Sequence, residues 1–228
     1  MRQKKEEPIL TDLIKERSLL KQDVYEKSKQ IFATFKERLN HKIDTYRSTI
    51  KEERVRLKIE EKGDFESLAF VGSDVLVFNM HTNVFCFPKE HAVWKTSYVA
   101  ENNDRAYCGI INVYNFLADS LLHGRMHDAG YLIARIFINI EGHYMVEGKG
   151  KLGFLFRDFI NGIIDEKTID QIIDEVVLHA VEFDLLTPPY DLIESVNVMQ
   201  IQAQSSALQM KTGKRLGFRF KSETDEIK

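Results

Sequence analysis

The chain has 228 residues, of which 43% are hydrophobic and 29% are charged, values close to those of ordinary globular proteins. This composition excludes a wholly disordered or fibrous chain, and the low content of 4 Pro and 12 Gly argues against a linker-rich one. The net charge of −3 makes nucleic-acid binding unlikely as a main role. The charge is divided unevenly, with +5 over residues 1–62 and −8 over the rest, which favours contact between the two parts, within one chain or between chains.

The sequence predicts a soluble, cytoplasmic protein. Cys86 and Cys108 both lie in apolar runs and are interpreted as buried thiols in a reducing compartment. The opening residues, MRQKKEEP, lack the apolar core of a signal peptide. No stretch approaches the length of apolar sequence that a membrane crossing needs. We expect neither membrane contact nor a cofactor.

Residues 9–50 contain neither Gly nor Pro and repeat apolar or semi-polar positions at about 3.6 residues, the period of a straight α-helix. Thr11 is the predicted N-cap. A helix of this length would be about 63 Å long, whereas the remaining body would be about 40 Å across. Either the part of the helix that extends beyond the body packs on a second copy or another partner, or the helix breaks near Asn40 and His41. We favour self-association, with a dimer as the expected state. The repeating positions are Leu10, Leu13, Leu20, Val24, Ser28, Ile31, Phe35, Leu39, Ile43, Tyr46 and Ile50.

After the helix the period changes to two, which indicates half-buried strands separated by short turns. Such a meander forms an antiparallel sheet with one covered face. The predicted strands are residues 55–59, 68–71, 75–80, 84–87 and 94–99.

The middle of the chain is ambiguous between helix and strand from 107 to 140. Residues 107–113 favour a strand and residues 114–122 a helix, and Asp128 is a candidate cap for a further helix that would run into a strand at residues 136–140. Thr168 to Gln171 has the form of a capping box, which predicts a helix as far as Phe183.

The C-terminal part predicts a final hairpin, with strands at 196–210 and 216–221. Residues 151–157 and 215–221 share the pattern basic, Leu, Gly, Phe, any residue, Phe, basic. We interpret both as return strands of similar hairpins that resemble each other by shared turn chemistry. Together these patterns predict an α+β fold with a mainly antiparallel sheet and packed helices, preceded by a long N-terminal amphipathic helix. The predicted division is a helical arm at 1–53 and an α+β domain at 54–228.

Two groups of residues are candidates for chemistry. Asp74, Glu147 and Lys149 have the residue types of a metal-dependent nuclease or hydrolase, in which carboxylates hold Mg²⁺ and a lysine stabilises the attacking water or the phosphate. His123 and His127 are spaced as a metal-binding pair on a helix, with Asp128 adjacent. A hairpin turn in the first case and a polar loop in the second are the simpler interpretations.

A third group, Lys211, Lys214 and Arg215, lies beside two phenylalanines and could contact an acidic protein surface or a single strand of nucleic acid. No nucleophile motif and no cysteine cluster typical of a zinc site is present. We therefore expect a non-catalytic interaction or sensor-like module that associates with itself, or with a protein partner, through its N-terminal helix. A small-ligand-binding domain and a metal-dependent hydrolase remain the alternatives.

Overall fold

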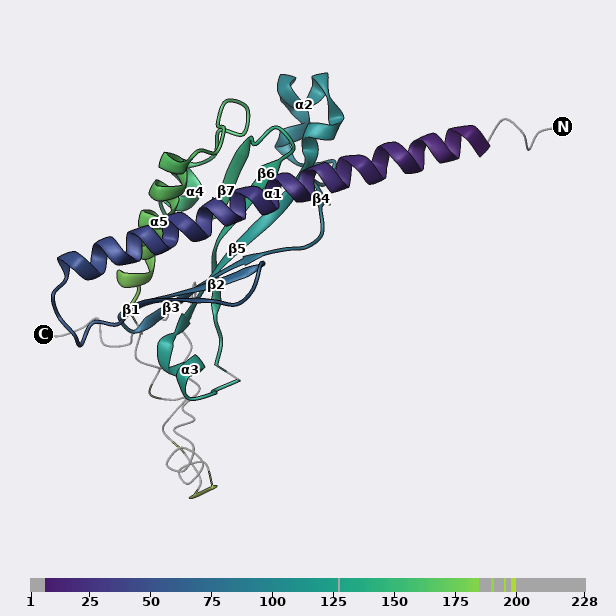
Figure 1. Ribbon diagram of the computed structural model, residues 1–228. Coiled ribbons are helices and arrows are strands. Elements are labelled where there is room, and N and C mark those ends of the chain that lie inside the picture. The colour runs from purple at the N-terminus through teal and green to yellow at the C-terminus, as the bar shows by residue number, and fades with distance from the viewer. Residues whose placement is uncertain (1–6, 127, 185–189, 191–194, 196–197, 200–228) are drawn as a thin grey trace, which may run out of the picture.

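The computed structural model describes residues 7–126, 128–184, 190, 195 and 198–199 and shows an α+β fold (Figure 1). Its centre is a seven-stranded antiparallel sheet with the path β1-β2-β3-β5-β6-β7, and β4 pairs with β5 beyond the end of β3. The strands are β1 (Leu57–Glu61), β2 (Glu66–Val71), β3 (Asp74–Met80), β4 (Phe85–Cys86), β5 (Tyr107–Leu117), β6 (Tyr131–Asn139) and β7 (Tyr144–Gly148).

Helix α1 (Glu7–Thr49) is continuous, so the predicted long helix is confirmed and the alternative break near Asn40 does not occur. It runs diagonally across one face of the sheet (Figure 1). Thr11 lies inside the helix, so its prediction as the N-cap was wrong. The residues of the apolar repeat that the fold buries are Leu20, Val24, Ser28, Ile31, Phe35, Leu39 and Ile43.

Helix α5 (Glu166–Val181) lies beside α1 on the same face of the sheet (Figure 1). Its N-cap is Asp165, whose side chain accepts a hydrogen bond from the Thr168 amide, so the predicted cap at Thr168 was three residues late. Arg38 of α1 donates to the Asp170 carboxylate, with 2.7 Å between Nε and Oδ1. Polar contacts thus fix the register of the two helices around a shared apolar core.

The two faces of the sheet are distinguished by a close approach between α1 and β5. A side chain at Gly109 would overlap Ser28 of α1, so residue 109 faces the helix, and the residues at alternate positions, Cys108 and Ile110, face away from it. We call the side away from α1 the open face. Because α1 and the strands bury the same core, the predicted boundary at residue 53 separates two parts of the chain that cover each other's apolar side chains.

Four segments differ from the predicted strands and helices. Residues 94–99 form no strand but belong to the 3-10 helix η2 (Ala92–Lys95) and to α2 (Ser97–Glu101), followed by η3 (Asn103–Ala106). We call residues 88–106 the lobe. The predicted helix at 114–122 is strand β5 as far as Leu117 and becomes α3 (Ala118–Leu122) only at its end.

The other two differences lie around β6 and β7. Residues 131–139 are all in strand β6, so Asp128 caps no helix there. Residues 152–155 form the short helix α4 (Leu152–Leu155) in place of a return strand. The chain folds back tightly onto the end of β7 here, since a Cβ atom added at Gly153 would lie 2.4 Å from the Gly148 carbonyl oxygen. The predicted hairpin at 196–221 lies outside the described residues apart from 198–199.

The two cysteines differ in environment. Cys108 is buried, as predicted, but Cys86 is exposed because β4 is a two-residue strand at the rim of the sheet. Both thiols are free. Among the described residues, no helix combines the length and apolar character that a membrane crossing requires.

Candidate functional site

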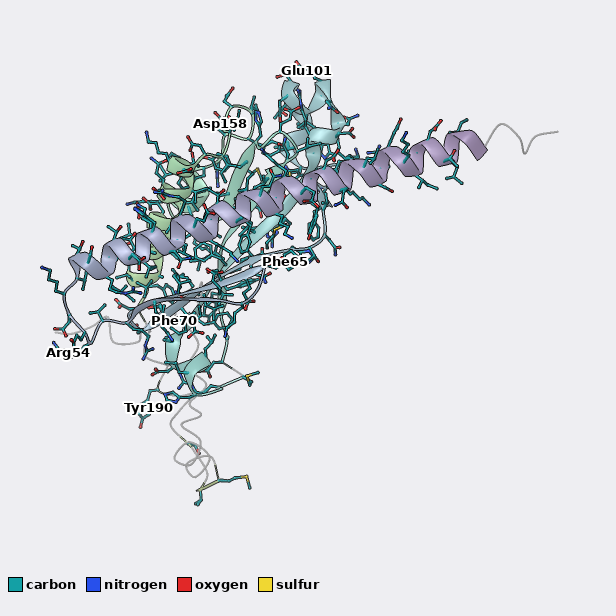
Figure 2. The ribbon with its side chains drawn as sticks, in the orientation of Figure 1. Arg54, Phe65, Phe70, Glu101, Asp158 and Tyr190 are labelled. Carbon is teal, nitrogen blue, oxygen red and sulfur yellow. The ribbon has the colours of Figure 1, made fainter. Side chains whose placement is uncertain are left out.

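The first candidate surface is the N-terminal end of α1, which extends past the sheet (Figure 1). We call residues 7–16 the α1 overhang. Its large apolar side chains are exposed, with fractions of 68% for Ile9, 58% for Leu10, 48% for Leu13 and 57% for Ile14. The side chains of this end project from the helix with no other element beside them (Figure 2).

The overhang continues the buried face of α1. Ile9 and Leu13 are one turn apart, and Leu20 and Val24 follow on the same row two turns further on. Leu20 and Val24 are buried against the sheet, so the same apolar row is covered in the body of the protein and exposed beyond it. The exposed part of the row is therefore an apolar packing surface that no other element of the described residues covers.

Arg17 marks the point at which α1 leaves the body. Its Nη1 atom donates to the Tyr107 hydroxyl at 3.1 Å and lies 3.4 Å from Asp104 Oδ1. The guanidinium also lies over the Tyr107 ring, 5.5 Å from its centroid. These contacts hold the direction of the helix and so fix where the overhang points.

The second candidate site begins with a row of polar residues across the open face. The strand register pairs Asn79 with Asn112, Asn112 with Arg135, and Arg135 with Glu147, and Glu66 stands opposite Asn79. Because directly opposed residues point to the same side of a sheet, all five side chains share the open face. Apolar clusters flank this polar row at both ends of the strands.

An open cleft of about 330 Å³ lies on the open face where the lobe meets the sheet, and a second hollow of about 540 Å³ adjoins it. We call the two together the open-face cleft. His91 and Glu147 line both parts. The remaining lining of the smaller part is mainly apolar: Phe85, Cys86, Phe87, Pro88, Cys108, Ile110, Arg135 and Phe137.

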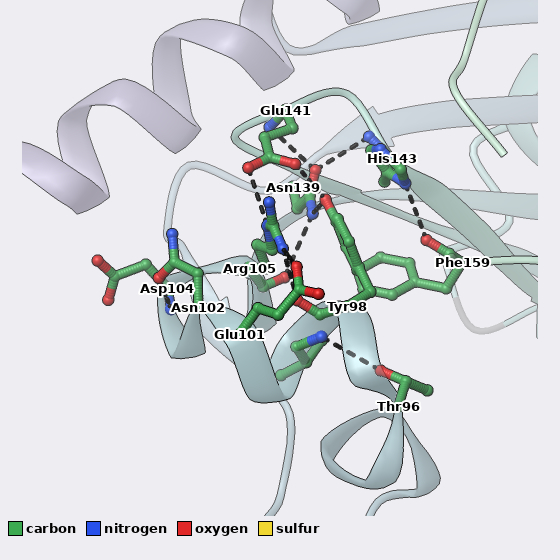
Figure 3. A network of polar contacts seen from close by, with 11 residues as sticks. Thr96, Tyr98, Glu101, Asn102, Asp104, Arg105, Asn139, Glu141, His143 and Phe159 are labelled. Carbon is green, nitrogen blue, oxygen red and sulfur yellow. Dashed lines mark hydrogen bonds and ion pairs between the residues drawn. The ribbon is translucent and has the colours of Figure 1, made fainter. Parts of the chain in front are cut away.

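The lobe that walls the cleft is anchored by a polar network around Asn139, which is fully buried (Figure 3). The Asn139 side-chain amide donates to the Tyr98 hydroxyl at 2.8 Å, and its oxygen accepts from the amides of Glu141 and His143 at 3.0 and 2.9 Å. The Tyr98 hydroxyl donates to Glu141 at 2.7 Å. The Asn139 amide thus uses its N–H groups to hold the lobe and its oxygen to hold the turn between β6 and β7.

Charge completes this anchor. Arg105 forms an ion pair with Glu141, with 2.9 Å between Nε and Oε1, and its guanidinium lies 4.3 Å from the centre of the Tyr98 ring. Partial burial works to raise the pKa of Glu141, but hydrogen bonds from Tyr98 and Arg105 outweigh it, so the pKa is lowered. Burial raises the pKa of Tyr98. Glu141 therefore remains the acceptor and Tyr98 the donor at neutral pH, and the wall of the cleft is firmly placed.

The structure does not bring the predicted nuclease residues together. Asp74 begins β3, whereas Glu147 is on β7, three strand spacings or about 14 Å across the sheet. Glu147 is also level with Asn79, five residues along β3 from Asp74. One metal ion could not bind both carboxylates in this arrangement. Lys149 follows β7 and lies in a separate hollow beside α5.

The predicted metal residues are only partly described. Helix α3 ends at Leu122, so His123 lies beyond it, in the break that precedes Gly124. His127 falls outside the described residues. Asp128 forms an ion pair with Arg125 at 2.9 Å and accepts from the Ser120 hydroxyl at 2.6 Å. Within the part of the chain that the structure describes, no three side chains of the metal-binding types form a group.

The third predicted group, Lys211, Lys214 and Arg215, lies outside the described residues. The sequence did not single out Arg135 and His91, which both line the open-face cleft. Arg135 was assigned to a helix, and only the register of β6 with β7 reveals that it faces Glu147. His91 carried a usable signal, because a histidine three residues after Pro88 and one before an apolar run is placed to cap a helix, which it does by accepting from the Val93 amide.

Both candidate surfaces are described from the chain itself, because comparison with protein families, with curated proteins and with solved structures finds no match.

Proposed function

We propose that this protein is a non-catalytic interaction module that associates with a second copy of itself through the α1 overhang. The observation that carries the proposal is the continuity of one apolar row from the buried part of α1 into its exposed end. Each copy presents the same row, so two overhangs can pack around a twofold axis with each burying the other's aliphatic side chains. The exposed apolar area on the overhang is what such a contact would use.

The size of the overhang sets the strength of the association. Four large aliphatic side chains on each copy are about half exposed, and covering each would contribute about 1 kcal/mol. Eight such side chains give about 8 kcal/mol before the cost of association, which is itself about 4 kcal/mol. The remainder of about 4 kcal/mol corresponds to a weak dimer with a dissociation constant of about 1 mM.

The test is the solution mass of the full chain as its concentration rises from about 0.1 to 2 mM, chosen to span the expected dissociation constant. The mass should increase from that of the 26.5 kDa monomer towards that of the dimer. The double variant Leu10→Glu, Leu13→Glu should remain monomeric throughout, because it places charge in the centre of the contact. Leu and Glu are both good helix formers, so the helix itself should persist.

The matched control is Leu19→Glu. Leu19 is also exposed, at 52%, but lies about 120° around the helix from Leu13. This variant should dimerise like the natural chain. A natural chain that stays monomeric over the whole series would overturn the proposal, and so would equal loss of association in both variants, since that would show a general charge effect.

A second candidate function, the binding of a small ligand, is favoured by the open-face cleft. Its volume, its aromatic lining and its few polar groups match the usual character of small-molecule sites.

Free thiols at Cys86 and Cys108 support a cytoplasmic location for either role.

A further inference from the structure

We infer that the open-face cleft takes a planar heteroaromatic ring that carries a hydrogen-bond donor next to an acceptor on one edge, as a nucleobase does. The inference rests on the proposed ligand-binding role of the cleft and names the chemistry of its ligand. It is independent of self-association, because the cleft is lined by the sheet and the lobe and includes no residue of α1.

The apolar part of the cleft is suited to a flat ring. Phe85, Phe87 and Phe137 line it, and Phe85 is 38% exposed despite being a large apolar side chain. The rings of Phe87 and Phe137 are held 5.0 Å apart, and His91 stacks on Phe87 at 4.7 Å. These side chains are therefore fixed by one another, which leaves a rigid aromatic surface against which a planar ligand can stack.

The polar side of the cleft offers a donor and an acceptor side by side. Arg135 and Glu147 are directly opposed on β6 and β7, and their charged groups meet in one long approach of 3.5 Å between Nη1 and Oε2. Both side chains are more than 40% exposed. A guanidinium has five N–H donors and a carboxylate about four acceptor positions, so this one approach leaves most of them able to bind a ligand.

The pairing of the two charges decides the class of ligand. A simple anion would meet the Glu147 carboxylate, and a simple cation would meet the Arg135 guanidinium. A ring edge with a carbonyl or ring nitrogen beside an N–H satisfies both groups at once, since arginine donates to the first and glutamate accepts from the second. The cleft therefore fits a neutral, flat ring with a donor and an acceptor on one edge.

His91 and the adjoining hollow add room for a substituent. The Nδ1 atom of His91 accepts from the Val93 amide, so in the neutral imidazole the proton is on Nε2, which makes that atom a donor. Arg157 lines the larger hollow next to His91 and Glu147. A polar group attached to the ring, such as a sugar, would extend into this larger part.

The experiment is a titration of the full chain with guanosine and, separately, with indole, followed by calorimetry and by amide chemical shifts. Guanosine carries an N–H beside a carbonyl, whereas indole has a flat ring and no acceptor. We expect guanosine to bind at least tenfold more tightly than indole and to shift the amides of β6, β7 and the lobe. Glu147→Gln should weaken guanosine binding about tenfold and leave indole binding unchanged.

The matched control is Glu66→Gln, which makes the same change at the other end of the polar row, outside the cleft lining. It should bind guanosine like the natural chain, and the amide spectra of both variants report whether they are folded. Guanosine binding no tighter than indole, or equal effects of the two variants, would overturn the inferred ligand class while ligand binding stands. Failure of both compounds to bind would overturn the class and the ligand-binding role together.

Discussion

Replacing Gly109 by alanine should destabilise the protein, because this glycine allows α1 to lie directly on β5. A Cβ atom at residue 109 would be 2.0 Å from Ser28 Oγ and 2.6 Å from Ser28 Cβ. The hydroxyl could rotate away, although it would then lose its 2.7 Å hydrogen bond to the Val24 carbonyl. The Cβ atom of Ser28 is fixed by the helix backbone, so α1 itself would have to move.

The size of the effect follows from the required movement. Carbon atoms in contact prefer a separation of about 3.5–4.0 Å, so the helix would have to withdraw by about 1 Å along much of its buried row. Overpacking of this kind costs about 1–3 kcal/mol, and we expect the upper part of that range because the site is fully buried. For a chain of this length the melting temperature should fall by about 4–12 °C.

The assay is urea unfolding of the natural chain, Gly109→Ala, and Gly109→Ala combined with a change at Ser28. Ser28→Gly removes both clashing atoms and should recover most of the loss, less about 1 kcal/mol for a glycine within a helix. Ser28→Ala keeps the Cβ atom and should recover little. A Gly109→Ala protein within about 0.5 kcal/mol of the natural chain would refute the packing of α1 on the sheet, as would equal recovery by both second changes.

Three further changes test other parts of the structure. Asn139→Ala should cost about 2–3 kcal/mol in urea unfolding, since it removes a fully buried side chain and leaves the Glu141 and His143 amides without their acceptor, whereas an exposed network would lose under 1 kcal/mol. The hydrogen bond from Arg38 lowers the pKa of Asp170 from 3.8. The contribution of ionised Asp170 to the unfolding free energy is therefore present above pH 3.8 and is lost as the pH falls through the lower folded-state pKa. Between about pH 5 and 3 the natural chain should therefore lose more unfolding free energy than Asp170→Asn, and parallel curves would contradict this. A thiol reagent should modify Cys86 rapidly and Cys108 only on unfolding, because burial raises the Cys108 pKa well above its usual range; two fast thiols would show that the lobe does not cover Cys108.

The long helix and the first strands were predictable because their patterns are long or sharply bounded. Residues 9–50 repeat at the helical period without a Gly or Pro, and tertiary packing had only to cover a stripe that was already present. The Gly-Ser-Asp sequence predicts the tight turn between β2 and β3, where Gly72 has a positive φ of 61°. In these segments local preference and burial agree.

The lobe and β6 were not predictable from period alone. Residues 94–99 are rich in aromatic and β-branched side chains, which favour strands, but Thr96 caps α2 by accepting from the Val99 amide, and the cap outweighs this weak preference. In β6, residues on both faces are buried, so the run has no polar side to mark its period. The candidate cleft depends on this strand, since Arg135 meets Glu147 only through the pairing of β6 with β7.

The contact between α1 and α5 has a consequence for how the protein is made. Arg38 and Asp170 are separated by 132 positions in the sequence, and Lys42 and Asp174 by the same number. Helix α1 is therefore synthesised long before α5, which covers part of its apolar side together with the sheet. Part of the apolar side of α1 should thus stay exposed in the nascent chain until α5 has been made.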